Sequence, residues 1–116
     1  VASYASTKAF NLILAQSLWY ELKSAGVDVI ACVAGATRTP NYLNSKPAGA
    51  SSSAPEMDPE PVVREALNGL GKKPYVVPGA LNKLAVLLLR RLMGRRGAVS
   101  MVAKNMYKLY GNGLYF

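Results

Sequence analysis

The front of the chain runs from a long helical pattern directly into a short apolar one. Over residues 4–25 apolar side chains recur at helical spacing, and Gly26 follows, as glycine commonly does after a helix. Residues 27–33, VDVIACV, are β-branched or apolar almost throughout, which is typical of a central strand in a parallel sheet. A helix joined by so tight a turn to a buried strand is half of a β-α-β unit, so the sequence predicts an α/β fold.

The first helix carries more apolar surface than one neighbour can cover. Leu12, Ala15 and Trp19 lie beside the main apolar stripe, and a helix that is apolar on more than one side contacts more than one neighbour. We expect the second neighbour to be another helix of the chain or a partner subunit, with Trp19 in that contact or in the core. Ser3 is placed to act as the N-cap.

Loops and shorter elements follow. Residues 39–57 are rich in Pro, Ser, Gly and Asn, and they predict a long loop of the kind that covers a binding site. Residues 58–70 predict a helix, with Asp58 as the cap and prolines in its first turn. Gly71 ends this helix, and PYVV at residues 74–77 predicts a short strand.

The chain divides into a domain at residues 1–79 and a tail at residues 80–116. The tail predicts a basic amphipathic helix over residues 80–96, a break at Gly97 and a last helix over residues 99–110.

Charge is distributed unevenly along the chain. All six acidic residues lie at or before Glu65, whereas residues 66–116 hold nine Lys or Arg. Such a tail suits contact with a membrane surface, and it could equally cover a substrate pocket or attract anionic substrates. No nucleic-acid-binding module is recognisable, so we expect no nucleic-acid partner.

The composition excludes several kinds of site. The chain has no histidine and a single cysteine, so it cannot form an internal disulfide, and we expect no metal site. Cys32 lies mid-strand among apolar residues, so we predict a buried space-filling role for it. No secretory leader pattern is visible, and the longest apolar run, residues 84–89, is too short to span a bilayer. We expect a cytoplasmic protein that can contact a membrane peripherally.

Tyr4 and Lys8 form the motif with most chemical content. Their i, i+4 spacing puts them on one helix face. A phenol with an ordinary pKa near ~10 is a poor acid or base at neutral pH, but an ammonium within ~4–6 Å favours the phenolate. A tyrosine paired in this way can exchange a proton with a carbonyl or alcohol oxygen. By itself the spacing is also common on solvated helix surfaces.

The order of the motifs is far more specific than the pair. YASTKAF opens a long helix, and GVDVIACV and AGATRTP follow it. This order resembles the short-chain dehydrogenase/reductase family from its active-site tyrosine onward, closely over residues 1–45 and loosely beyond. The resemblance implies the C-terminal part of a Rossmann-like, doubly wound parallel sheet, with extra C-terminal helices. It also implies an NAD(P)-dependent oxidoreductase that interconverts a carbonyl and an alcohol.

The resemblance assigns a role to each matching position. Tyr4 would be the proton donor or acceptor, and Lys8 would lower its pKa and bind the nicotinamide ribose. Gly35 would let the backbone turn close to the nicotinamide, while the Thr37 backbone and the Thr39 hydroxyl would contact the cofactor. The expected cofactor is NADP or NAD, with NADP favoured.

Three neighbouring positions bear on this assignment. Ala34 replaces the proline that the family has before the glycine, which loosens the turn because alanine does not fix φ. Arg38 is placed either to approach a phosphate or to lie in solvent. Tyr42 and Leu43 would belong to the substrate loop, with surface packing as the alternative.

Several family parts are missing from the sequence. The phosphate-binding glycine loop and the catalytic serine precede the tyrosine in the family, and no GxGxxG motif follows a strand here. We therefore expect the C-terminal half of a longer enzyme, inactive alone. The pattern also resembles hydroxysteroid and long-chain 3-oxoacyl reductases, which implies a lipid-like, steroid or 3-oxoacyl substrate. The family further implies a homodimer or tetramer formed through the helix at residues 4–25. The alternative is a non-catalytic module that binds membranes through its basic tail.

Overall fold

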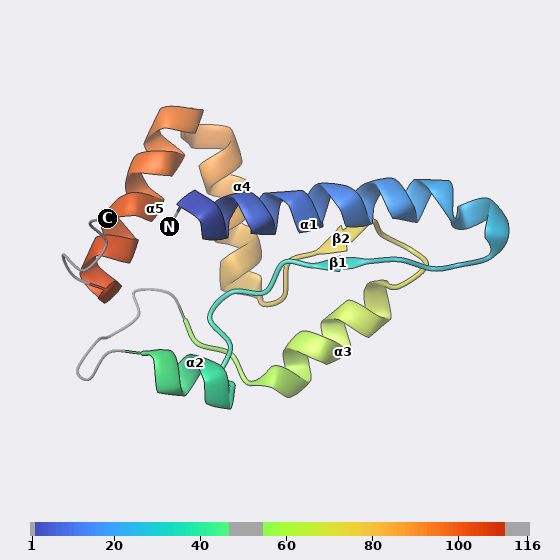
Figure 1. The fold of residues 1–116 in the computed structure, drawn as a ribbon, viewed down its shortest axis with the longest axis horizontal. Helices are drawn as coiled ribbons and strands as arrows, with labels where there is room; N and C mark the ends of the chain where they lie inside the picture. Colours follow the sequence, from blue (N-terminus) through green and yellow to red (C-terminus); the bar gives the residue numbers. More distant parts are fainter. Residues whose placement is uncertain (1, 47–54, 111–116) are drawn as a thin grey trace.

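The first helix, α1, covers Ala2–Glu21, and the short 3-10 helix η1 at Lys23–Ala25 continues it. A computed structural model describes residues 2–46 and 55–110 (Figure 1). Ser3 lies inside α1, where its carbonyl accepts a hydrogen bond from the Thr7 hydroxyl at 2.7 Å, so the predicted Ser3 cap is wrong. The predicted long helix is otherwise confirmed.

Gly26 ends the helical segment as predicted. Its φ of 71° is left-handed, and its N–H donates to the Lys23 carbonyl. An added Cβ would meet nothing within 4 Å, so the backbone conformation alone calls for glycine here.

Two short parallel strands, β1 at Ala31–Cys32 and β2 at Tyr75–Val76, form the sheet. Ala31 pairs with Tyr75 and Cys32 with Val76. The parallel arrangement is confirmed, but the strand bounds predicted from the apolar runs are too long. Strand assignment requires a hydrogen-bonded ladder, and apolar composition extends well beyond the residues that form one.

The next helix, α3, covers Pro59–Gly69 and contacts β2. Asp58 stands at its N-cap position without a capping hydrogen bond, because its carboxylate pairs with Arg38 instead. Val62 of α3 and Val76 of β2 are the buried hydrophobic residues of the described structure. The core therefore lies between α3 and the sheet.

The predicted loop at residues 39–57 contains a helix, α2, at Pro40–Ser45, which corrects the prediction. The Thr39 hydroxyl accepts a hydrogen bond from the Tyr42 N–H at 3.2 Å, and Pro40 occupies the first turn. A Thr cap followed by Pro is a helix start, and the Ser- and Gly-rich residues beyond it masked that signal. Residues 47–54 of the predicted loop lie outside the described residues.

The tail forms α4 at Ala80–Leu92 and α5 at Arg95–Tyr110, so its helical character is confirmed but the predicted break is misplaced. Met93 is extended, with φ −112° and ψ 123°, and its N–H donates to the Leu89 carbonyl. Gly97, the predicted breaker, lies inside α5. Isolated glycine costs a helix only about 1 kcal/mol relative to alanine, so neighbouring structure can override it.

The helices lie on both sides of the sheet. In Figure 1 the strands run between α1 and α3, and residue contacts join α1 to β1 and α3 to β2. This is an α/β layered arrangement, although most of the described chain is helical. Of the described helices, none combines the length and apolar character needed to cross a bilayer.

The described residues cover only one side of α1. Leu12, Ala15 and Trp19 are half-buried on the side that contacts β1, whereas Phe10 and Ile13 are 65% and 62% exposed on the other. Trp19 is therefore on the sheet side, with the Lys23 ammonium 5.4 Å from its ring centroid. No described helix covers the side of α1 that exposes Phe10 and Ile13.

Candidate active site

Tyr4 and Lys8 lie side by side on the face of α1 that turns toward β1. The Lys8 Nζ is 5.4 Å from the centroid of the Tyr4 ring. Tyr4 is 60% exposed, so its hydroxyl can be reached from outside. The helix produces this pairing directly, because residues four apart stand one above the other on its surface.

A hollow of about 590 Å³ opens between the first half of α1 and the carboxyl end of β1. Both Tyr4 and Lys8 line it, together with the backbone that leaves the strand at Val33 and Ala34. Four of its lining residues are alanines, which leave room at the wall, and Asn11 adds a polar group. The volume falls in the range of small-molecule sites, roughly 300–1,000 Å³.

Gly35 makes a close approach to α4. A Cβ at this position would lie 2.8 Å from Nδ2 of Asn82, so no larger residue fits unless Asn82 moves. The Thr37 hydroxyl donates to the Gly35 carbonyl at 3.1 Å. Thr37 also forms an isolated parallel bridge with Met57, which holds this turn beside the chain leading to α3.

The structure separates the predicted cofactor residues into two groups. Tyr4 and Lys8 share the hollow, whereas Gly35, Thr37 and Thr39 do not line it. They follow it along the chain, and the hydroxyl of Thr39 accepts the capping bond of α2. The cofactor roles of these three residues stay predictions.

Tyr42 and Leu43 differ in their surroundings. The Tyr42 hydroxyl donates to Oε1 of Glu56 at 3.1 Å, and the Lys46 ammonium reaches the same oxygen at 2.7 Å. These bonds lower the pKa of Glu56, with Lys46 the larger cause, and the bond to Glu56 raises the pKa of Lys46. Leu43 is 53% exposed. Tyr42 is thus tied to the base of the predicted loop, and Leu43 remains accessible.

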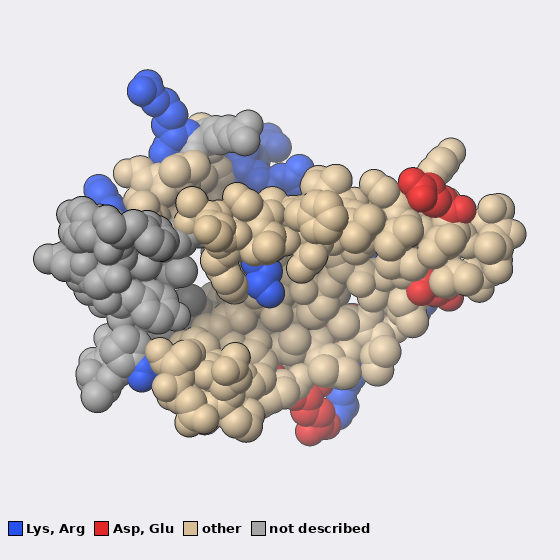
Figure 2. All heavy atoms as spheres, in the orientation of Figure 1, with Lys and Arg blue, Asp and Glu red and all other residues tan. Residues whose placement is uncertain are grey.

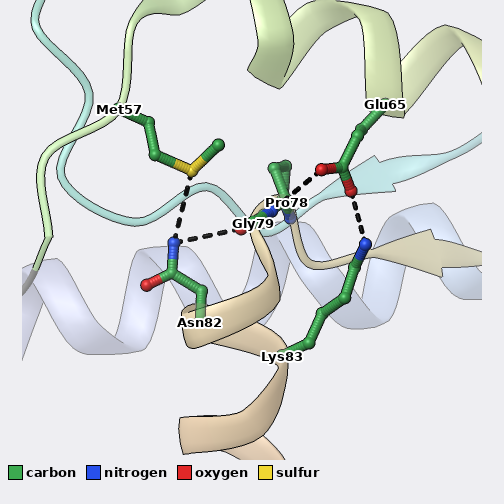
Figure 3. A network of polar contacts seen from close by, with 6 residues as sticks. All are labelled: Met57, Glu65, Pro78, Gly79, Asn82 and Lys83. Carbon is green, nitrogen blue, oxygen red and sulfur yellow. Dashed lines mark hydrogen bonds and ion pairs between the residues drawn. The ribbon is translucent and has the colours of Figure 1, made fainter.

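A polar network joins the turn after β2 to α3 and α4, and the sequence did not reveal it (Figure 3). Glu65 accepts from the Gly79 N–H at 3.1 Å and from the Lys83 ammonium at 2.6 Å. The bond to Lys83 first, and the Gly79 N–H next, lower the pKa of the Glu65 carboxyl.

Asn82 completes this network on the side of Gly35. Its Nδ2 donates to the Pro78 carbonyl at 3.0 Å and lies 3.6 Å from the Met57 sulfur. The Pro78-Gly79 pair was the available signal: Gly79 has a φ of 86°, a turn conformation suited to glycine.

Arg38 pairs with Asp58, with 2.8 Å between nitrogen and oxygen. Both side chains are largely exposed, so this ion pair contributes little to stability. The approach of Arg38 to a phosphate stays a prediction.

Cys32 corrects another prediction, because it is exposed rather than buried. It lines the hollow beside Tyr4 and Lys8. Partial desolvation of the thiol raises its pKa, and the Glu65 carboxylate adds to this. The thiol therefore stays protonated near neutral pH and is a weak nucleophile.

The chain is similar to enzymes from three bacterial species. A 7beta-hydroxysteroid dehydrogenase of Clostridium sardiniense is 37% identical over 82 residues, which are 71% of this chain and 31% of that protein. Proteins of the same name from Mediterraneibacter gnavus and Collinsella aerofaciens are 36% identical over 86 residues, 72% of this chain. The chain spans about a third of the length of these curated relatives.

No family model and no solved structure matches the chain. The assignment therefore depends on the relatives together with the motifs. The tyrosine–lysine pair opens α1, the parallel strand β1 follows, and a glycine turn leaves its carboxyl end. With this order and these relatives, the chain belongs to the short-chain dehydrogenase/reductase family.

Proposed function

We propose that this chain supplies the proton-transfer part of an NAD(P)-dependent oxidoreductase that interconverts a carbonyl and an alcohol. The observation that carries the proposal is the shared hollow, in which Tyr4 and Lys8 stand together beside the carboxyl end of a parallel strand. Ligands of α/β sheets bind at this end of the strands. In the full-length protein we place the chain at the C-terminal side of a Rossmann-like, doubly wound sheet.

The two side chains have different tasks in this proposal. The Tyr4 hydroxyl gives a proton to the carbonyl oxygen during reduction and takes it from the alcohol during oxidation. Lys8 places a positive charge beside the phenol and donates hydrogen bonds to ribose hydroxyls. The proton transfer needs the tyrosine to be accessible, and Tyr4 is largely exposed.

We place the nicotinamide end of the cofactor in the hollow. Lys8 offers an ammonium donor and Asn11 an amide, while the alanines leave space for a flat ring. Gly35, Thr37 and Thr39 would extend this binding surface along the chain. A nicotinamide cofactor, when bound, supplies or accepts the hydride. Either NADP or NAD is compatible with these residues, and we favour NADP.

The proposal is tested by Tyr4→Phe in the natural full-length protein. We expect kcat to fall by a factor of about 100 or more, because general acid–base catalysis contributes roughly that much. Cofactor affinity, measured by fluorescence titration, should change little, since phenylalanine keeps the ring.

Tyr20→Phe is the matched control. Tyr20 is also on α1 and is 77% exposed, but it does not line the hollow. Near-normal turnover by Tyr4→Phe would refute the proton-transfer role, and an equal loss in both variants would indicate damage to the helix.

We further propose a lipid-like substrate, with a hydroxysteroid as the first choice and a 3-oxoacyl chain as the second. Support comes from the names of the relatives and from the apolar side chains Leu12 and Val33 in the hollow. Steady-state rates with hydroxysteroids, 3-oxoacyl thioesters and short polar alcohols would separate these choices. A preference for the short polar alcohols would contradict the proposal.

A second candidate function is peripheral membrane binding, and a leucine stripe on α4 supports it. Leu81, Leu84 and Leu92 are 64%, 51% and 74% exposed and share one face of the helix. Arg91, in the last turn, lies beside this face by helical spacing. The expected result is binding to anionic vesicles that weakens with salt and is lost in Leu84→Ser/Leu88→Ser. Salt-independent binding, or none, would exclude it.

A further inference from the structure

A groove between β2 and α4 combines cationic side chains with an apolar floor. Its volume is about 650 Å³, and it shares no lining residue with the hollow around Tyr4 and Lys8. Val77 and Val86 lie half-buried in it, beside the exposed Leu87. Its cations come from both elements: Lys73, Lys83, Arg90 and Arg91.

The positive charge in the groove is largely uncompensated. No Asp or Glu is among its lining residues. Glu65 pairs with Lys83, whereas Lys73, Arg90 and Arg91 form no ion pair within the described residues. In Figure 2 blue side chains gather around α4 and α5 with no red ones among them. Like charges held together in this way repel one another and attract anions.

One of these cations is held in place by the sheet. The Arg90 guanidinium donates to the Tyr75 hydroxyl at 3.2 Å. This bond directs the exposed arginine toward the strand. An arginine oriented beforehand loses less side-chain entropy when it binds an anion.

We propose that this groove binds an amphipathic phosphate, meaning a phosphomonoester that carries an apolar chain. The phosphate would lie between Lys73, Arg90 and Arg91, because arginine pairs with phosphate through two parallel hydrogen bonds. The apolar chain of the ligand would lie on the floor formed by Val77, Val86 and Leu87.

The geometry points to a dissolved molecule rather than to a bilayer. Helical spacing places Leu81, Leu84 and Leu88 on the face of α4 opposite Val86 and Arg90. Leu87 and Arg91 lie between these two sides. A membrane that met the leucine stripe would therefore leave Val86 and Arg90 facing away from it.

The test is calorimetric titration of the natural full-length protein with dodecyl phosphate below its micellar concentration. We expect one saturable site, with inorganic phosphate bound at least about tenfold more weakly because it lacks the apolar chain. Dodecyl maltoside, which has the same chain and no charge, should not compete for the site.

Two double variants with equal charge change locate the site. Arg90→Gln/Arg91→Gln should weaken dodecyl phosphate by about tenfold or more. Arg96→Gln/Lys104→Gln removes two exposed charges outside the groove and should stay within about twofold of the parent protein. Leu87→Ser keeps every charge. It should reduce the affinity that is gained when the alkyl chain of the ligand is lengthened, so it tests the apolar floor without disturbing Arg90.

The proposal fails if both double variants weaken binding equally, since net charge would then be the cause. It also fails if no variant changes binding. Binding to anionic vesicles without binding to the dissolved ligand would assign the cations to the membrane instead.

Discussion

At the scale of single residues, Tyr4 and Gly35 each have a close partner, and the two pairs arise in different ways. Tyr4 and Lys8 are neighbours because they are four apart in a helix, so their pairing could be read from the chain. Gly35 and Asn82 are far apart in sequence, and their contact depends on how α4 follows β2. The glycine was predicted for its backbone, and the amide that faces it was not.

This contact predicts a coupled effect of two substitutions. Gly35→Ala would put a Cβ 2.8 Å from Nδ2 of Asn82, and moving the amide would break its hydrogen bond to Pro78. We expect a loss of about 1 kcal/mol in the free energy of unfolding, the usual worth of one such bond. Urea unfolding of the full-length protein measures it.

The matched background is Asn82→Ala, in which no side-chain amide is left to collide. There the same Gly35→Ala change should cost much less, and the difference gives the coupling energy. Equal costs in both backgrounds would place the strain elsewhere.

Glu65 predicts a pH dependence. Its bonds to Lys83 and Gly79 lower the pKa of the folded carboxyl below the ordinary 4.5. The contribution of the Glu65 carboxylate to stability is therefore fully present above the ordinary pKa of 4.5. It is lost as pH falls through the lowered pKa of the folded state. Below it, the Tm difference between the parent protein and Glu65→Gln should shrink. Glu60→Gln, on an exposed pair of the same helix, is the control. If this Tm difference grew as the pH was lowered, the assigned direction of the Glu65 pKa shift would be wrong.

At the scale of elements, the two sides of α1 have different surroundings. One side contacts β1 and carries the hollow, and the other exposes Phe10 and Ile13. The sequence predicted the excess apolar surface, but amphipathic pattern alone does not say what covers it.

We propose that a second copy of the protein covers the exposed side of α1. The substitution Phe10→Ser/Ile13→Ser should then reduce the mass of the full-length protein, measured by light scattering, from that of a dimer or tetramer. Its circular dichroism should stay unchanged, because both residues already lie in solvent here. Leu43→Ser, an equally polar change on exposed α2, should leave the mass unaltered. A mutant of unchanged mass would place the interface elsewhere.

Element boundaries were harder to predict than element types. The apolar runs located both strands and their parallel pairing, but they could not show where the ladder ends. Gly97 was the expected helix breaker, yet the break falls at Met93 and Gly94, and an isolated glycine costs a helix only about 1 kcal/mol relative to alanine. The network around Glu65 required three elements to meet, so no local pattern could indicate it.

At the scale of the whole molecule, the described chain buries little of its apolar content. Hydrophobic residues make up 51% of the sequence, yet only Val62 and Val76 are buried hydrophobics among the described residues. Burial supplies about 25 cal/mol per Å² of apolar surface, and folding must offset a conformational entropy of roughly 1–2 kcal/mol per residue. So small a core cannot supply a cooperative transition by itself.

The 116-residue chain expressed alone should therefore melt without a sharp transition. It should also bind a hydrophobic dye such as ANS, because the outer side of α1 and the leucines of α4 are exposed. In the longer protein that we propose, further structure can cover these surfaces, so that protein should melt cooperatively and bind much less dye. Calorimetry and dye fluorescence on the two proteins make the comparison. A sharp, reversible transition of the short chain, with no dye binding, would mean that these faces are covered in some other way, for example by self-association, which light scattering would detect.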